Sequence, residues 1–169
     1  MCIRDSVNNA GGGMSPQPLP ETTVADLDGH LDSHLRSAFE CTQAVLPGMR
    51  ERGGGRIVNI TSEAAFGSPP PNLTGYAVAK AAVVALTKSA AVEAGPWGIT
   101  VNAVAPGMTE TAMIDDVPQR AKMTVAAQAP LRRLASPDDT AEVVSFLLGH
   151  GGAYVTGQTL HVNGGQYLP

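Results

Sequence analysis

One pair of segments constrains the fold of this chain more than any other. Residues 57–62 read Ile-Val-Asn-Ile-Thr-Ser, and after a Gly/Pro-rich stretch Tyr76 and Lys80 follow, four positions apart. The first run predicts a buried strand that ends at the hydroxyl of Ser62. The second predicts a helix with Tyr76 and Lys80 on one face, because residues i and i+4 are neighbours on a helix. A phenol beside an ammonium group, with a hydroxyl nearby to hold an oxygen, supplies what reversible carbonyl reduction needs.

Strands and helices are expected to alternate along the chain. Apolar residues recur at helical spacing in some segments and form short continuous runs in others, with Gly and Pro between them. Such alternation predicts parallel strands in a layered α/β fold. The expected helices cover residues 26–50, 75–94 and 136–148, and the expected strands cover residues 56–61, 99–105 and 159–162. Residues 108–135 lack strong periodicity and are expected to form a loop with short helices.

Composition excludes several classes of protein. The 169 residues carry a formal net charge of −4 and only 15% charged residues, which argues against both disorder and a nucleic-acid surface. Cys2 and Cys41 form neither a metal-binding spacing nor a disulfide framework, so a reducing compartment is expected and no metal site. No apolar run reaches the length of a membrane span, and the N-terminus lacks the pattern of a signal peptide. We therefore expect a cytoplasmic protein that binds neither membranes nor nucleic acid.

The first six residues do not match the segment that follows them. Val7 and the next residues look like the end of a buried strand, yet residues 1–6 contain one strong apolar residue where several are expected. We interpret residues 1–6 as a foreign or artefactual start. Residues 7–169 are then expected to form a partial domain.

Five motifs occur in an order that resembles a known family. They are Asn8-Asn9-Ala10-Gly11, Ser62 at a strand end, Tyr76-x-x-x-Lys80, the run from Asn102 to Gly107, and Thr156-Gly157-Gln158 leading to Val162-Asn163-Gly164-Gly165. In this order they resemble the short-chain dehydrogenase/reductase family, similar to 3-oxoacyl-carrier-protein reductases. The resemblance implies the C-terminal part of a doubly wound parallel-sheet Rossmann fold with three α/β/α layers. It also implies an NAD- or NADP-dependent oxidoreductase that acts on a ketone or secondary alcohol, as a homotetramer or homodimer.

The resemblance also implies roles for individual residues. Tyr76 is the expected general acid and base, and Lys80 is expected to lower its pKa, which is about 10 in a free phenol, and to bind the nicotinamide ribose. Ser62 is expected to hold the substrate oxygen. The expected cofactor contacts are Asn8, Asn9, Ala10, Gly11, Tyr76, Lys80, Pro106, Gly107, Thr109 and Thr111.

Two departures from the family pattern leave alternatives open. His34 stands where the family's active-site tetrad has an asparagine, and it is either a proton-relay residue or an ordinary helix histidine. No glycine-rich phosphate turn is present, and a missing piece on the order of 80 residues is expected from the size of such strand–helix units. The alternatives are therefore an inactive fragment and a non-catalytic binding protein of the same fold.

Other side chains have simpler expected roles. His30, His150 and His161 show no partner spacing and are expected at the surface or in packing. Cys41 is expected to be a small core residue, and Thr61 is expected to be structural. Met108, Met113 and Met123 are either pocket residues or loop filler.

Overall fold

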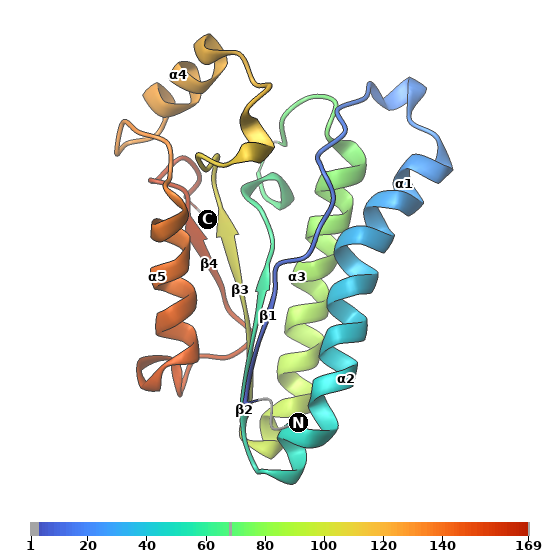
Figure 1. Ribbon diagram of the computed structural model, residues 1–169, viewed down its shortest axis with the longest axis vertical. Helices are drawn as coiled ribbons and strands as arrows, with labels where there is room; N and C mark the ends of the chain where they lie inside the picture. Colours follow the sequence, from blue (N-terminus) through green and yellow to red (C-terminus); the bar gives the residue numbers. More distant parts are fainter. Residues whose placement is uncertain (1–3, 68, 169) are drawn as a thin grey trace.

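The computed structural model describes residues 4–67 and 69–168, and its centre is one parallel sheet. The strands are β1 (Asp5–Asn8), β2 (Gly55–Ile60), β3 (Ile99–Pro106) and β4 (Thr159–Val162), and they lie side by side in chain order. The expected α/β fold is confirmed (Figure 1).

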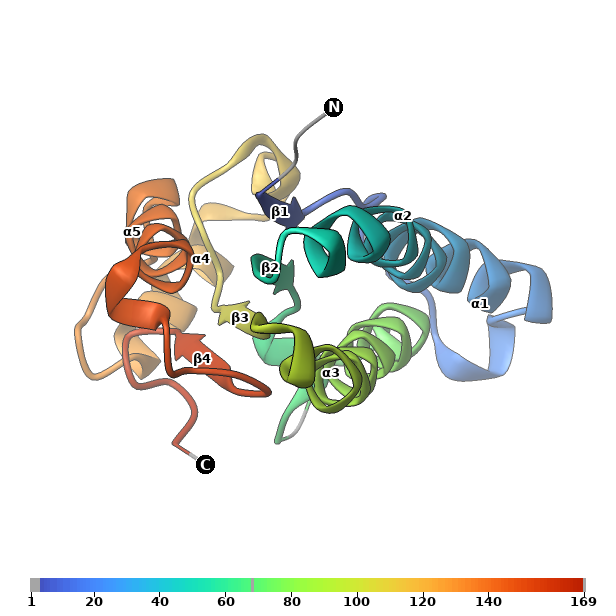
Figure 2. The ribbon, with the colours of Figure 1, turned by 90° about the horizontal axis from the view of Figure 1, so that it is seen from below.

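Helices cover both faces of this sheet. On one face lie α1 (Val24–His30), α2 (Ser37–Glu51) and α3 (Thr74–Ala94), and on the other lies α5 (Pro137–Leu148) (Figure 2). The short helix α4 (Gln119–Gln128) lies beyond the carboxyl end of β3 (Figure 1). These are the three layers of an α/β/α fold.

The connection from β3 to β4 has the opposite hand to the two connections before it. All three steps move to the next strand in the same direction, and all the strands are parallel. The first two steps pass over the face that carries α2 and α3, whereas the third passes over the α5 face (Figure 2). Since connections between parallel strands are right-handed in about 98% of cases, the α5 crossover is the unusual element of this topology.

The core has one apolar cluster on each side of the sheet. On the α2 and α3 side, Met49 and Ala94 pack against Ile57, Ile99 and Val101. On the α5 side, Leu147 packs against Val58 and Val104. Side chains of successive strand residues point to opposite faces, so a continuous apolar run such as β3 supplies both clusters.

Buried asparagines link the strands to each other and to a helix. Asn8 Nδ2 donates to Asn59 Oδ1 at 2.7 Å, and Asn59 Nδ2 donates to Thr87 Oγ1 at 2.8 Å. This chain of hydrogen bonds joins β1, β2 and α3. On the other side of the sheet, Asn102 Nδ2 donates to the carbonyl of Val155 at 2.7 Å.

The first strand begins earlier than expected. Asp5 and Ser6 pair with Arg56 and Ile57 of β2, so β1 starts two residues before Val7. The ladder with β2 supplies the pairing that the weak local pattern does not predict. Residues 1–3 lie outside the described part of the chain, and the foreign origin of residues 1–6 stays a prediction.

The long helix expected over residues 26–50 contains an irregular segment. α1 and α2 are joined without a break by a π-helical stretch, η2 (Leu31–Arg36). The expectation that Cys41 is a core residue is wrong, because Cys41 is exposed on α2. The buried positions of α2 are Ala38, Thr42 and Met49, and Cys41 lies off the face that they define.

Candidate active site

A cavity of about 910 Å³ opens at the carboxyl ends of the strands. Segments that follow β1, β2, β3 and β4 all line it, which is the usual place for a ligand in an open parallel sheet. Ten of the twelve residues expected in the site lie on its wall. They are Asn9, Gly11, His34, Ser62, Tyr76, Lys80, Pro106, Gly107, Thr109 and Thr111.

The other two expected cofactor contacts do not line this cavity. The side chain of Asn8 is buried and bonded to Asn59 and Thr42, so it serves the core. Ala10 is absent from the cavity wall, although Asn9 and Gly11 on either side of it are present. The loop after β1 therefore faces the cavity with alternate residues.

β2 and α3 hold the three predicted catalytic side chains together. Ser62 follows the end of β2, and a hydrogen bond links its side chain to that of Tyr76. Lys80 Nζ donates to the carbonyl of Ile60 at 2.9 Å and lies 5.8 Å from the ring centroid of Tyr76. The spacing of Tyr76 and Lys80 along the sequence thus predicted their common face.

Burial controls the acidity of the phenol and the ammonium group. The pKa of Tyr76 is raised by its burial, and the hydrogen bond from Ser62 lowers it in part. Burial lowers the pKa of Lys80 to about 8. The Lys80 ammonium donates to a strand carbonyl, and the expectation that it lowers the pKa of Tyr76 stays a prediction.

His34 lies in η2, and its imidazole points at the phenol. The two ring centroids are 5.2 Å apart at an interplanar angle of 86°, so His34 meets Tyr76 edge to face. His34 is only 3% exposed, and neither of its ring nitrogens has a hydrogen-bond partner among the described residues. Burial, with Lys80 and His30 nearby, lowers the pKa of His34 to about 4.

His30 also belongs to this neighbourhood, which the sequence reasoning missed. Its ring stacks on that of His34 with centroids 6.0 Å apart and lies 6.3 Å from Tyr76. The available signal was the four-residue spacing of His30 and His34, the same spacing that identified Tyr76 and Lys80. His30 was expected at the surface or in packing, and it is half-buried.

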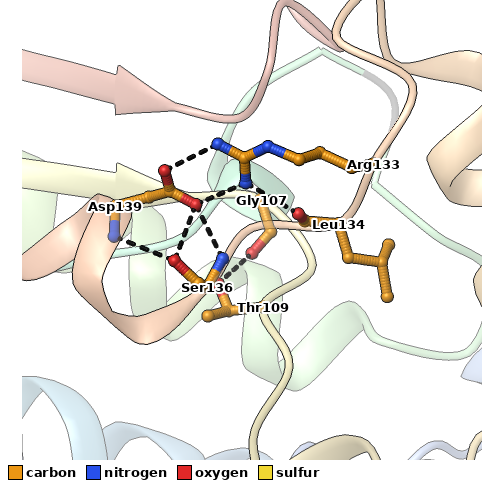
Figure 3. Close-up of polar contacts among 6 residues, drawn as sticks. All are labelled: Gly107, Thr109, Arg133, Leu134, Ser136 and Asp139. Atoms are coloured by element: carbon orange, nitrogen blue, oxygen red, sulfur yellow. Dashed lines mark hydrogen bonds and ion pairs between the residues drawn. The ribbon is translucent and has the colours of Figure 1, made fainter.

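The wall opposite β2 is a loop that is anchored by an ion pair. Arg133 binds both carboxylate oxygens of Asp139 at 2.6 and 2.7 Å, and the Asp139 carboxylate also accepts from Ser136 at the start of α5 (Figure 3). Residue Ala135 then pairs with the segment around Thr109. This arrangement connects the N-terminus of α5 to the wall that contains Gly107 and Thr109 (Figure 3).

Apolar side chains make up much of the cavity wall. Met108 and Met113 line it, whereas Met123 does not. Glu63 and Tyr167 also lie on the wall and were not predicted. Glu63 Oε2 accepts a 2.8 Å hydrogen bond from Asn163, which fixes the carboxylate. No motif marks Glu63 or Tyr167 in the sequence, because the C-terminal segment reaches Glu63 and Phe66 only through tertiary folding.

Comparisons with known proteins agree with this geometry. A family model described as Enoyl-(Acyl carrier protein) reductase matches residues 5–166. The chain is 42% identical over 162 residues to (2S)-[(R)-hydroxy(phenyl)methyl]succinyl-CoA dehydrogenase subunit BbsD of Thauera aromatica, covering 96% of this chain and 64% of that protein.

Solved structures show the same fold. A 3-oxoacyl-[acyl-carrier protein] reductase from Brucella melitensis matches with a TM-score of 0.95 and 33% identity, over 100% of this chain and 65% of that one. A variant of ElxO with NADPH bound matches with a TM-score of 0.88 and 31% identity, over 96% and 66% of the two chains.

The fold, the cavity and these comparisons define the class of the protein. The chain belongs to the short-chain dehydrogenase/reductase family. It spans about two thirds of the length of the relatives that it matches. Among the described helices, none combines the length and apolar character needed to cross a bilayer. Within residues 4–67 and 69–168, no cluster of three His, Cys, Asp or Glu side chains is arranged to hold a metal ion.

Proposed function

We propose that the protein containing this chain is an oxidoreductase that uses NAD or NADP. It transfers a hydride between the nicotinamide and a ketone or secondary alcohol, and Tyr76 is its general acid and base. The observation that carries this proposal is the placement of Ser62, Tyr76 and Lys80 on one cavity wall, with Ser62 bonded to the Tyr76 phenol.

The residues on the wall fit the nicotinamide and ribose part of such a cofactor. Lys80 Nζ has three donors, and one is used by the Ile60 carbonyl. The remaining donors are suited to ribose hydroxyls, and the backbone from Pro106 to Thr109 is available for the carboxamide. The glycine-rich turn that binds pyrophosphate is absent from this sequence, so the fit covers one half of the dinucleotide.

Each polar side chain has a distinct role in this proposal. The bound nicotinamide supplies or accepts the hydride. In the direction of reduction, the Tyr76 hydroxyl gives its proton to the carbonyl oxygen as the hydride reaches the carbon. Ser62 donates a hydrogen bond to the same oxygen and stabilises its developing charge. Lys80, as a buried cation near the phenol, stabilises the phenolate that is left.

The cavity supports a substrate with an apolar body. Four apolar side chains share the cavity wall with Ser62, namely Met108, Met113, Ile114 and Phe66, and flexible methionines adapt to varied apolar shapes. Two of the relatives reported above are named for acyl groups carried by coenzyme A or by acyl carrier protein. A test panel therefore includes 3-oxoacyl thioesters together with simple ketones and secondary alcohols.

The proposal extends to assembly and location. A homodimer or homotetramer is supported by large apolar side chains exposed on α2 and α3, namely Phe39, Val78 and Val92. A cytoplasmic location is supported by the low cysteine content. Size-exclusion chromatography with light scattering tests the first of these.

The experiment that tests the activity compares Tyr76→Phe with the unchanged protein, at its full coding length. We expect turnover of the panel to fall by about 100-fold or more, while cofactor binding, measured by nicotinamide fluorescence, is kept. Tyr154→Phe is the matched control, because Tyr154 is fully exposed and remote from the cavity. Cofactor binding without turnover by the unchanged protein across the whole panel would favour a non-catalytic binder.

A further inference from the structure

One acidic side chain lies on the wall of the candidate active site. Glu63 directly follows Ser62 in the chain, and both residues line the cavity. Among the described residues on this wall, Glu63 is the one carboxylic acid, and Lys80 is the one lysine or arginine. The ammonium of Lys80 already donates to the carbonyl of Ile60. Glu63 is therefore a charged group of the wall that the proposed reaction does not use.

Hydrogen bonds hold this carboxylate in one place. Glu63 Oε2 accepts from Asn163 Nδ2 at 2.8 Å, and His161 Nδ1 lies 3.6 Å from the same oxygen. Asn163 is itself fixed, because its Nδ2 also donates to the carbonyl of Tyr167 and its Oδ1 accepts from the amide of Gly165, both at 2.9 Å. A group that is already ordered loses little further freedom when it binds a ligand.

Three rings stabilise the wall around Glu63. The ring centroids of Phe66 and His161 are 4.5 Å apart, and that of Tyr167 lies 5.2 Å from His161 and 5.9 Å from Phe66. Phe66 and Tyr167 line the cavity as well. The turn after β2 and the C-terminal segment therefore form one packed wall, and the carboxylate belongs to it.

The second oxygen of the Glu63 carboxylate has no partner. An ionised carboxylate is an acceptor with about four lone-pair sites, and the described residues donate one hydrogen bond to this side chain, at Oε2. Within residues 4–67 and 69–168, no lysine or arginine forms an ion pair with Glu63. The side chain keeps 19% of its surface exposed, so Oε1 is available to a donor that enters the cavity.

The contacts of Glu63 do not account for its charge. A neutral glutamine side chain also has a carbonyl oxygen, which would accept the same hydrogen bond from Asn163. Withdrawing a charge from water without a full partner costs free energy. The negative charge therefore serves something other than the anchor to the C-terminal segment.

We propose that Glu63 is a specificity-determining residue that binds a hydrogen-bond donor of the substrate, either a hydroxyl or a protonated amino group, within a few bonds of the reacting carbonyl. This inference rests on the proposed function, since it names the substrate class of the same site. The Cα atoms of Ser62 and Glu63 are about 3.8 Å apart, as in any trans peptide. A substrate whose oxygen is held by Ser62 therefore brings its neighbouring atoms close to Glu63.

The charge of Glu63 gives selectivity in two directions. A site that is built to hydrogen-bond a substrate group rejects the analogue that lacks it, because the polar group of the site is then left unpaired. A substrate with its own carboxylate at the same place is repelled by the like charge. The apolar side chains on the rest of the wall, such as Met108 and Met113, accept the body of either substrate equally.

Four phenyl ketones that differ in a single group test this assignment. They are β-hydroxypropiophenone, β-aminopropiophenone, butyrophenone and β-benzoylpropionate, which carry a hydroxyl, an ammonium, a methyl or a carboxylate on the same carbon. The measured quantity is kcat/KM relative to butyrophenone, in the full-length protein with saturating cofactor. In Glu63→Gln we expect this ratio to fall by about 10-fold or more for the hydroxy and amino ketones and to rise for β-benzoylpropionate.

Glu110→Gln is the matched control. It makes the same chemical change at an exposed glutamate outside the cavity wall, in the loop beside Thr109, and we expect every ratio to stay unchanged. A loss in Glu63→Gln with both donor-carrying ketones supports a general donor site, and a loss with the amine alone identifies the bound group as an ammonium. Unchanged ratios in Glu63→Gln, or equal changes in Glu110→Gln, would overturn the proposal.

A second measurement depends neither on turnover nor on a variant. Saturation-transfer NMR gives the order in which the four ketones bind to the unchanged protein in the presence of cofactor. We expect β-benzoylpropionate to bind more weakly than the two donor-carrying ketones, and equal or tighter binding would reject the role of Glu63. Absence of turnover with all four ketones would instead reject the proposed activity, so the two failures are distinguishable.

Discussion

Thr61 Oγ1 donates a 2.8 Å hydrogen bond to the backbone carbonyl of Lys80. The side chain of the same lysine returns to the strand, where its Nζ donates to the carbonyl of Ile60 at 2.9 Å. Lys80 is therefore attached to the end of β2 by both its main chain and its side chain. This double attachment sets the position of α3, and with it the position of Tyr76 relative to Ser62.

Loss of the Thr61 hydroxyl is expected to loosen this attachment. Thr61→Val keeps the shape of a fully buried side chain but removes one hydrogen bond. We expect the free energy of unfolding to fall by about 1–2 kcal/mol and kcat/KM to fall several-fold, since small misplacements of catalytic groups are costly. Thr124→Val is the control, because the Thr124 hydroxyl also bonds to a helix carbonyl but is exposed. Equal losses in the two variants would contradict the positioning role of Thr61.

Local patterns predicted the elements that carry the chemistry. The apolar run at 56–61 corresponds to β2 (Gly55–Ile60), and the run at 159–162 corresponds to β4. The spacing of Tyr76 and Lys80 was sufficient to place both on one cavity wall. Strong periodicity and fixed spacing are local properties, so they are readable without the fold.

The features that escaped prediction depend on tertiary contacts. Asp5 and Ser6 form a strand because β2 offers a partner, and their own residue types do not favour one. Thr109 pairs with Ala135 across a segment without periodicity. The π-helical stretch around His34 has no motif either. The spacing of His30 and His34 was visible in the sequence, but only the ring geometry shows that the two imidazoles stack.

Gly11 is expected to tolerate no side chain while His34 holds its present position. A Cβ at residue 11 would lie 2.4 Å from Nδ1 and 2.6 Å from Cε1 of the imidazole. We expect Gly11→Ala to displace the ring or the loop, to cost about 1–3 kcal/mol and to reduce turnover strongly. Gly13→Ala is the control, since its Cβ would meet nothing within 4 Å.

The double variant Gly11→Ala with His34→Ala identifies the cause. Removal of the imidazole relieves the overlap, so thermal unfolding of the double variant should return most of the stability that Gly11→Ala loses. If the two losses simply add, the contact between residue 11 and His34 is not the source of the damage.

The buried side chain of His34 is expected to make the stability of the fold sensitive to acid. Burial lowers its pKa from 6.5 to about 4, so the unfolded chain binds more protons than the folded one between these values. Stability should therefore fall as the pH falls from 6.5 to 4, by about 2–3 kcal/mol from this group. His34→Asn should lose less stability than the unchanged protein between pH 7 and pH 4.5 in urea unfolding. Parallel pH profiles would contradict this assignment.

The buried asparagine chain should show strong coupling. Asn8 donates to Asn59 at 2.7 Å, and both side chains are buried. Replacing either by Ala removes the hydrogen bond between them, while Asn8 keeps Thr42 and Asn59 keeps Thr87 as a partner, so each single variant should lose about 1–3 kcal/mol. In a double-mutant cycle the second replacement should cost less than it does alone. A coupling energy of zero, measured by urea unfolding, would show that the two amides act independently.

The last prediction concerns the loop that closes the cavity. The bidentate pair of Arg133 and Asp139 fixes residues just before α5, and Ala135 then bonds to the segment around Thr109. Asp139→Asn weakens both the pair and the helix cap, so we expect faster hydrogen exchange at the amides of Glu110 and Ala135 and a higher KM. The ion pair holds the pKa of Asp139 well below its usual range. The stability that Asp139 contributes is therefore complete at pH values above the pKa that its carboxyl group has in the unfolded chain, and it is lost as the pH falls. Arg133→Met separates the two contributions, because it removes the ion pair and leaves the Ser136 cap. If Arg133→Met leaves both the exchange rates and KM unchanged, the cap alone anchors the loop, and the ion pair is only a surface contact.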